Sequence, residues 1–208
     1  MENIAKITMV FNSLPGQLAR ENKKFVYQLV RNGARAKEYE DAIQWLIGSG
    51  LVYQVKRITK PGIPLTAYDD LSAFKLFSLD VGLLRRMLRL SSFAYAEGNR
   101  LFTEFKGAIT ENYILQSLVT QFKDIPYYWS SGNTAELDFI VQYKNEIIPI
   151  EVKYDENVKS RSLTIYNQKY QPKIRIRYSL KNLQFKDGLL NIPHFMSDYT
   201  TDLIKKLL

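Results

Sequence analysis

The sequence contains no cysteine and only one histidine, and these scarcities remove several kinds of site. Without cysteine, the chain forms no disulfide, no thiolate zinc site and no cysteine nucleophile. His194 has no second histidine with which to share a metal, so we predict a structural role for it. A Gly-rich phosphate loop of the form G-x-x-x-x-G-K-S/T is also missing, so we expect no ATP hydrolysis from this chain.

Long apolar runs are missing as well. None approaches the roughly 20 residues that a membrane-spanning helix needs, and the N-terminus lacks the basic start and apolar stretch of a signal peptide. We therefore expect a cytoplasmic protein. What is present is an ample core: 46% of the 208 residues are hydrophobic, enough for one large or two small globular domains.

The formal charge of +8 arises mainly from residues 1–100. Such an excess favours a polyanionic partner, DNA before an anionic membrane, although solubility alone would also account for it. The basic residues that we predict as DNA contacts are Arg31, Arg35, Lys37, Lys56, Arg57, Lys60, Lys173, Arg175 and Arg177. The last three alternate with apolar residues along an expected strand, so their face is either solvated surface or a ridge that contacts phosphate.

The first part of the chain has the pattern of a winged helix over residues 1–90. Three expected helices, over 4–14, 17–21 and 35–48, precede two expected strands that are joined by a basic loop. The third helix carries the acids Glu38, Glu40 and Asp41, which would repel phosphate. A winged helix used for protein contact is therefore equally consistent with the sequence.

A small, polar stretch over residues 91–100 predicts a linker, followed by a second domain over 101–208. That domain begins with an expected helix over 101–122. Glu111 lies at the edge of the apolar stripe of this helix, and alone it would be interpreted as a solvated residue. We predict a mixed α/β (α+β) protein.

The stretch ELDFIVQYKNEIIPIEVK, from Glu136 to Lys153, carries the candidate chemistry. Two runs rich in β-branched and aromatic residues flank Lys144 and Asn145, which predicts a β-hairpin with a two-residue turn. In that register Asp138 faces Glu151. Because side chains alternate along a strand, Lys153 shares the face of Glu151, and the opposite face is wholly apolar, with Leu137, Phe139, Val141, Ile148, Ile150 and Val152.

Two opposed carboxylates destabilise a strand pair unless a cation offsets them. Mg²⁺ or Mn²⁺ is the natural candidate, because hard divalent cations prefer oxygen ligands. Lys153 would orient or help to deprotonate a water bound to such an ion. The same residues also fit a plain charged edge, with Asp138 open to water and Glu151 and Lys153 in a weak ion pair.

The order of a helix bearing Glu111, a strand bearing Asp138 and a neighbouring strand bearing Glu151-x-Lys153 resembles the PD-(D/E)xK nuclease superfamily. The chain is more closely similar to bacterial and archaeal AAA-type ATPases whose C-terminal half is a domain of unknown function with a nuclease-like core. The stretches that carry this resemblance are LARENKKFVYQLV, ARAKEYEDAIQWLIGSGLVYQV, LSAFKLFSLDVGLL, KGAITENYILQSL, YYWSSGNTAELDFIV and IIPIEVK.

The resemblance implies a restriction-endonuclease-like core with a mixed central sheet. It implies that Glu111, Asp138 and Glu151 ligate Mg²⁺ or Mn²⁺ and that Lys153 positions the water that attacks a DNA phosphodiester. It further implies that a P-loop ATPase domain precedes this segment, so that ATP would bind only through that domain and this chain is a C-terminal part. Since the superfamily includes members that bind nucleic acid without cutting it, the alternative is a non-catalytic module that docks DNA or a protein to an ATPase.

Overall fold

The computed structural model describes residues 2–20, 23–90, 103–132, 134–155 and 157–208. Within these ranges it contains six α-helices and a mixed β-sheet of eight strands, which confirms the predicted mixed α and β fold class. The winged helix and the restriction-endonuclease-like core stay predictions. The predicted linker over 91–100 lies outside the described residues.

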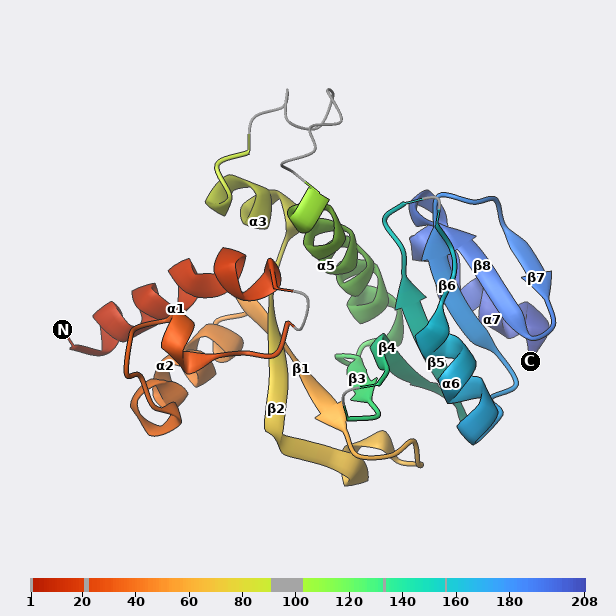
Figure 1. The fold of residues 1–208 in the computed structure, drawn as a ribbon, viewed down its shortest axis with the longest axis horizontal. Helices are drawn as coiled ribbons and strands as arrows, with labels where there is room; N and C mark the ends of the chain where they lie inside the picture. The colour runs from red at the N-terminus through yellow and green to blue at the C-terminus, as the bar shows by residue number, and fades with distance from the viewer. Residues whose placement is uncertain (1, 21–22, 91–102, 133, 156) are drawn as a thin grey trace. The chain divides into compact units, whose positions relative to one another are not determined.

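The chain divides into two compact units (Figure 1). The first comprises residues 1–55 and 73–112, and the second comprises residues 56–72 and 113–208. Residues 56–72 thus belong to the second unit, whereas the sequence prediction places them in a domain over 1–90. The long helix α5 (Thr103–Phe122) contributes residues to both units.

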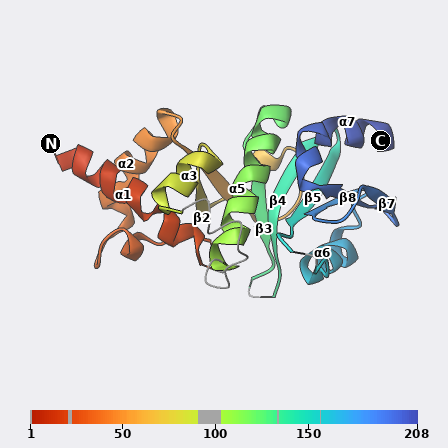
Figure 2. The same cartoon turned by 90° about the horizontal axis from the view of Figure 1, so that it is seen from above.

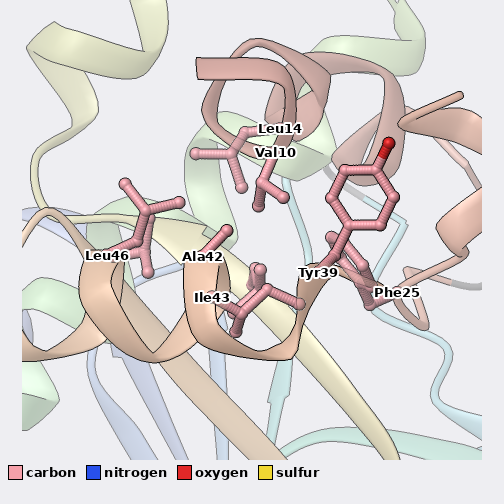
Figure 3. Packing of buried hydrophobic residues seen from close by; sticks show 9 residues of the cluster. Val10, Leu14, Phe25, Tyr39, Ala42, Ile43 and Leu46 are labelled. Atoms are coloured by element: carbon pink, nitrogen blue, oxygen red, sulfur yellow. The ribbon is translucent and has the colours of Figure 1, made fainter. Parts of the chain in front are cut away.

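The first unit is mainly helical. Its elements are α1 (Glu2–Leu18), the 3-10 helix η1 (Tyr27–Leu29), α2 (Ala36–Gly48), most of β1 (Val52–Ile58) and of β2 (Asp69–Ser78), and α3 (Val81–Met87). Apolar residues at helical spacing on α1 and α2 face one another, as Val10, Leu14, Ala42 and Leu46 do in Figure 3. The packing of these two helices, which also encloses Phe25, forms the core of this unit.

The predicted helix end at Leu14 is wrong, because α1 continues through Pro15 to Leu18. Proline usually ends or kinks a helix, since it lacks a backbone N–H donor and its ring crowds the preceding turn. Here Val10, Leu14 and Leu18 lie on the buried side of the same helix, each at most 1% exposed. Their burial in the core stabilises the helical path beyond the proline.

The second unit is built on the sheet, whose strand order is β2-β1-β3-β4-β5-β6-β8-β7. Besides the ends of β1 and β2, its elements are the 3-10 helix η2 (Leu65–Tyr68), β3 (Tyr127–Ser130), β4 (Glu136–Tyr143), β5 (Glu146–Val152), α6 (Arg161–Tyr170), β6 (Arg175–Ser179), β7 (Gln184–Lys186), β8 (Leu189–Pro193), the 3-10 helix η4 (His194–Tyr199) and α7 (Thr200–Leu207). The edge strand β7 is not among the predicted strands.

The centre of this sheet joins a hairpin to a parallel set of strands. β4 and β5 are antiparallel, whereas β5, β6 and β8 run parallel to one another. Parallel neighbours need a crossover connection, and α6 supplies it between β5 and β6. Figure 2 shows α6 and α7 on opposite faces of the sheet, so strand residues that point to either face become buried.

Candidate functional site

The predicted register of the β4–β5 hairpin is confirmed. Phe139 pairs with Ile150 and Tyr143 with Glu146 around the turn at Lys144, whose φ of 52° is left-handed. The pairing that the structure shows ends at Phe139 and Ile150, so the opposition of Asp138 and Glu151, one residue further on, stays a prediction. The apolar face is also as predicted, since its members are all buried: Leu137, Phe139, Val141, Ile148, Ile150 and Val152.

The other face of the hairpin is apolar in its middle, between Gln142 near the turn and Glu151 at the open end. Ile140 and Ile147, which point to this face, belong to the cluster that packs against Leu163 and Tyr166 of α6. Glu151 is 6% exposed, and its Oε1 lies 2.7 Å from Nζ of Lys153. The open end of the hairpin therefore carries one acid–lysine pair, in which Glu151 is buried and the Lys153 side chain is 28% exposed.

The charge of Lys153 is set by its acidic neighbours. Burial by itself lowers the pKa of the ammonium, but Glu151, followed by Asp138 and Asp155, raises the pKa above its ordinary value. Lys153 is thus a cation at neutral pH. It can hold an anion or orient a water molecule in this state, but it cannot accept a proton.

Asp138 closes the hairpin where the strand pairing ends. Its Oδ2 accepts a hydrogen bond of 2.7 Å from the backbone N–H of Val152. This hydrogen bond fixes the Asp138 side chain beside β5, at the residue that directly follows Glu151.

Arg177 of β6 adds a second cation to this end of the sheet. It is the register partner of Glu151 on one side and of Asn191 on the other. Its Nε donates to Oδ1 of Asn191 (2.9 Å), and its Nη1 donates to the carbonyl of Val158 (2.9 Å). The sequence shows Arg177 as one of three alternating basic residues, but its place beside Glu151 follows from a strand pairing that no local pattern reveals.

His194 fixes the backbone of Lys153. Nε2 of His194 lies 2.9 Å from the Lys153 carbonyl oxygen, and because a carbonyl only accepts, Nε2 carries the proton. Burial lowers the pKa of the imidazole, and the hydrogen bond to Lys153 partly opposes this shift. His194 is therefore neutral near pH 7 and has the structural role that its isolation in the sequence predicts.

Glu111 lies in the first unit, whereas Asp138, Glu151 and Lys153 lie in the second. Glu111 is 6% exposed, and its Oε1 accepts a hydrogen bond of 2.8 Å from Nζ of Lys23. Within the described residues, no three His, Cys, Asp or Glu side chains gather into a group that could hold a metal ion. The three-carboxylate metal site stays a prediction.

The predicted DNA contacts fall into two groups. Arg31, Arg35 and Lys37 are exposed in the first unit. The other six contact groups of the second unit: Lys56 binds Asp69, Arg57 binds Asp70, Lys60 lies over the ring of Tyr68, Lys173 binds Glu146, Arg175 binds the carbonyl of Asp187, and Arg177 binds Asn191 and Val158.

Asp70 accepts several hydrogen bonds. Its carboxylate accepts hydrogen bonds from the hydroxyl and backbone N–H of Ser72, at 2.6 and 2.9 Å, and from Nε of Arg57 at 2.8 Å. The Ser72 hydroxyl contributes most, and although burial opposes the shift, the Ser72 and Arg57 contacts together lower the pKa of Asp70 to about 2. The positive charge of Arg57 is therefore largely offset by the carboxylate of Asp70.

Comparison with known proteins matches each half of the chain to a family model. Residues 1–94 match a Domain of unknown function (DUF8612), and residues 106–195 match a Domain of unknown function (DUF4143), which is typically found in AAA-ATPase-associated proteins. No curated protein and no solved structure matches the chain. The link to AAA-type ATPases that the sequence predicts is thus supported at the level of this second domain.

None of the described helices combines the length and apolar character that a bilayer crossing requires.

Proposed function

We propose that this chain works as part of an AAA-type ATPase and that Asp138, Glu151 and Lys153 form a Mg²⁺-dependent phosphodiesterase site that acts on DNA. The observation that supports this best is the 2.7 Å contact from Glu151 to Lys153, together with the hairpin register, which would oppose the two acids if it continued one residue beyond Phe139 and Ile150. The match of residues 106–195 to an ATPase-associated domain supplies the context.

The donor set of the hairpin fits Mg²⁺ or Mn²⁺. Asp138 and Glu151 offer carboxylate oxygens from adjacent strands, and both cations prefer such hard ligands. A bound divalent ion supplies a polarised phosphoryl oxygen and an acidified water.

The side chains of the chain have separate tasks in this site. The Lys153 ammonium holds the attacking water or a phosphate oxygen by charge, since it carries a positive charge at neutral pH. The bonds from Lys153 N–H to the Tyr178 carbonyl (2.9 Å) and from His194 to the Lys153 carbonyl keep its backbone in place. Such preorganisation reduces the cost of positioning a nucleophile.

The proposal is tested by cleavage of single-stranded, duplex and branched DNA in the presence of Mg²⁺ or Mn²⁺. Asp138→Asn should abolish the cuts, because the amide removes the negative charge and keeps the shape of the side chain. Asp202→Asn, an exposed acid on α7, is the matched control and should cut as the wild type does. Equal cleavage by the wild type and Asp138→Asn would overturn the proposal.

A second candidate function is a non-catalytic docking module of the ATPase. It is favoured by an exposed stripe on α2, where Glu38, Asp41 and Trp45 recur at helical spacing and Trp45 is 51% exposed. Two acids beside an aromatic ring suit a basic protein segment and repel DNA phosphate.

Tryptophan fluorescence separates the two kinds of partner for α2. The other tryptophan, Trp129, is 1% exposed, so quenching by a ligand reports on Trp45. Quenching by an oligolysine peptide, with no response to a DNA oligonucleotide, supports protein docking through α2. The reverse result removes this candidate.

A further inference from the structure

Besides Phe185 on β7, three aromatic side chains in the described part of the second unit are exposed. Phe195 is 78% exposed, Tyr199 is 58% exposed and Tyr154 is 36% exposed. Phe195 and Tyr199 belong to η4, and Tyr154 directly follows Lys153. Single exposed apolar residues are common. Exposed aromatic residues on segments that meet beside charged side chains are candidates for contact with a ligand.

The hydrogen bond between His194 and the Lys153 carbonyl brings these segments together. Each of its two residues is followed directly in sequence by an exposed aromatic residue, Phe195 after His194 and Tyr154 after Lys153. Lys153, whose Nζ lies 2.7 Å from Oε1 of Glu151, thus directly precedes Tyr154, and its carbonyl is bonded to the residue that directly precedes Phe195.

The position of η4 is fixed without any contribution from the burial of Phe195. Gln121 of α5 donates to the carbonyl of Ser197 (2.8 Å), and the hydroxyl of Ser117 lies 2.8 Å from that of Ser197. Thr200 also donates to the Ser197 carbonyl (2.5 Å). Phe195 is thereby presented to solvent on a rigid support, which lowers the entropic cost of stacking a ligand on it.

We propose that Tyr154 and Phe195 form a stacking platform for the bases of single-stranded DNA, whose phosphates lie toward Lys153 and Arg177. This inference rests on the proposed function and specifies its substrate class. Every base has a π face, so aromatic platforms bind single strands with little sequence preference. In a duplex the bases are stacked on each other and are not available to the platform.

The surroundings favour a nucleic acid over an apolar protein surface. The segment after Tyr154 exposes the polar residues Asp155, Asn157 and Lys159. Lys153 and Arg177 supply the positive charge that a phosphate backbone needs.

The test measures the binding of a fluorescein-labelled oligothymidylate of about 12 nucleotides by anisotropy, because one binding module covers roughly that length. The full chain is used in EDTA, so that binding is read without cleavage. Phe195→Ala should weaken binding about fivefold or more, since a base–aromatic contact is lost. Phe195→Trp should retain the affinity. Phe185→Ala, which removes a 47% exposed aromatic on β7, should leave it unchanged.

Equal affinities for wild type, Phe195→Ala and Phe185→Ala would overturn the inference, as would a duplex of the same sequence that binds at least as tightly as the single strand. Phe195 is exposed, so circular dichroism should show an unchanged fold for its variants. The outcome is separable from that of the proposed function. If Asp138→Asn cuts as the wild type does while Phe195→Ala still loses binding, the nuclease proposal fails and the stacking platform stands.

Discussion

Replacing Asn191 by alanine removes a side chain that joins three segments of the second unit. Its Oδ1 accepts from Nε of Arg177 (2.9 Å) and from the Ser179 hydroxyl (2.7 Å). Its Nδ2 donates to the carbonyls of Lys181 and Asn182, each at 3.0 Å. Asn191 is 3% exposed, so its side-chain amide has almost no contact with solvent.

The expected loss of stability in Asn191→Ala depends on whether each former hydrogen-bond partner of Asn191 can bind water instead. A net hydrogen bond contributes about 0.5–1.5 kcal/mol, and a buried group left without a partner costs more. Lys181 and Asn182 lie in an exposed segment, so their carbonyls can bind water instead. Ser179 is fully buried and lacks this alternative. We therefore expect Asn191→Ala to lower the free energy of unfolding by about 3 kcal/mol.

Equilibrium urea unfolding measures this cost, with Asn182→Ala as the control. The Asn182 side chain is exposed and its backbone carbonyl is kept, so this variant should change stability by less than about 0.5 kcal/mol. A loss below about 1 kcal/mol in Asn191→Ala, similar to that of the control, would refute the reasoning that a shielded amide fixes this region.

Three further changes test other parts of the fold. Asp70→Asn should lower the free energy of unfolding by about 1 kcal/mol above pH 4, after allowance for solvent screening. Because the pKa of Asp70 is about 2, the difference in Tm between the variant and the wild type should disappear as the pH falls from about 4 to 2, and a constant difference would contradict this. Tyr178→Phe should cost about 1 kcal/mol in urea unfolding, since the buried hydroxyl loses its 2.5 Å contact with Thr200, and an unchanged midpoint would argue against that bond. Leu14→Ala should lower the free energy of unfolding by about 2–5 kcal/mol, measured by thermal unfolding. Ile4→Ala, at a 68% exposed position on the same helix, should change it little, and similar losses in the two variants would contradict the packing in Figure 3.

The hairpin at the candidate site could be predicted from the sequence because all of its determinants are local. The two-residue turn at Lys144 sets the register, and alternation along the strands then decides which residues share a face. The same reasoning predicts that Asp138, Glu151 and Lys153 share one face, and the 2.7 Å contact between Glu151 and Lys153 agrees with it. The alternation of basic residues in β6 was equally visible.

The remainder depends on contacts between distant segments. Arg177 lies beside Glu151 because β6 pairs with β5 in parallel through a crossover, and Asn191 becomes its neighbour through a further parallel pairing. Such pairings have no signature within a short window. The path of α1 through Pro15 has the same origin, since burial of Leu14 and Leu18 in the core outweighs the local preference of proline.

Calorimetric titration of Mn²⁺ into the full chain tests most directly whether the acids of β4 and β5 hold a divalent ion. The wild type should bind Mn²⁺, Asp138→Asn and Glu151→Gln should lose the binding heat, and Asp202→Asn should retain it. No heat with the wild type, or equal heat with all four proteins, would contradict a metal site on the hairpin.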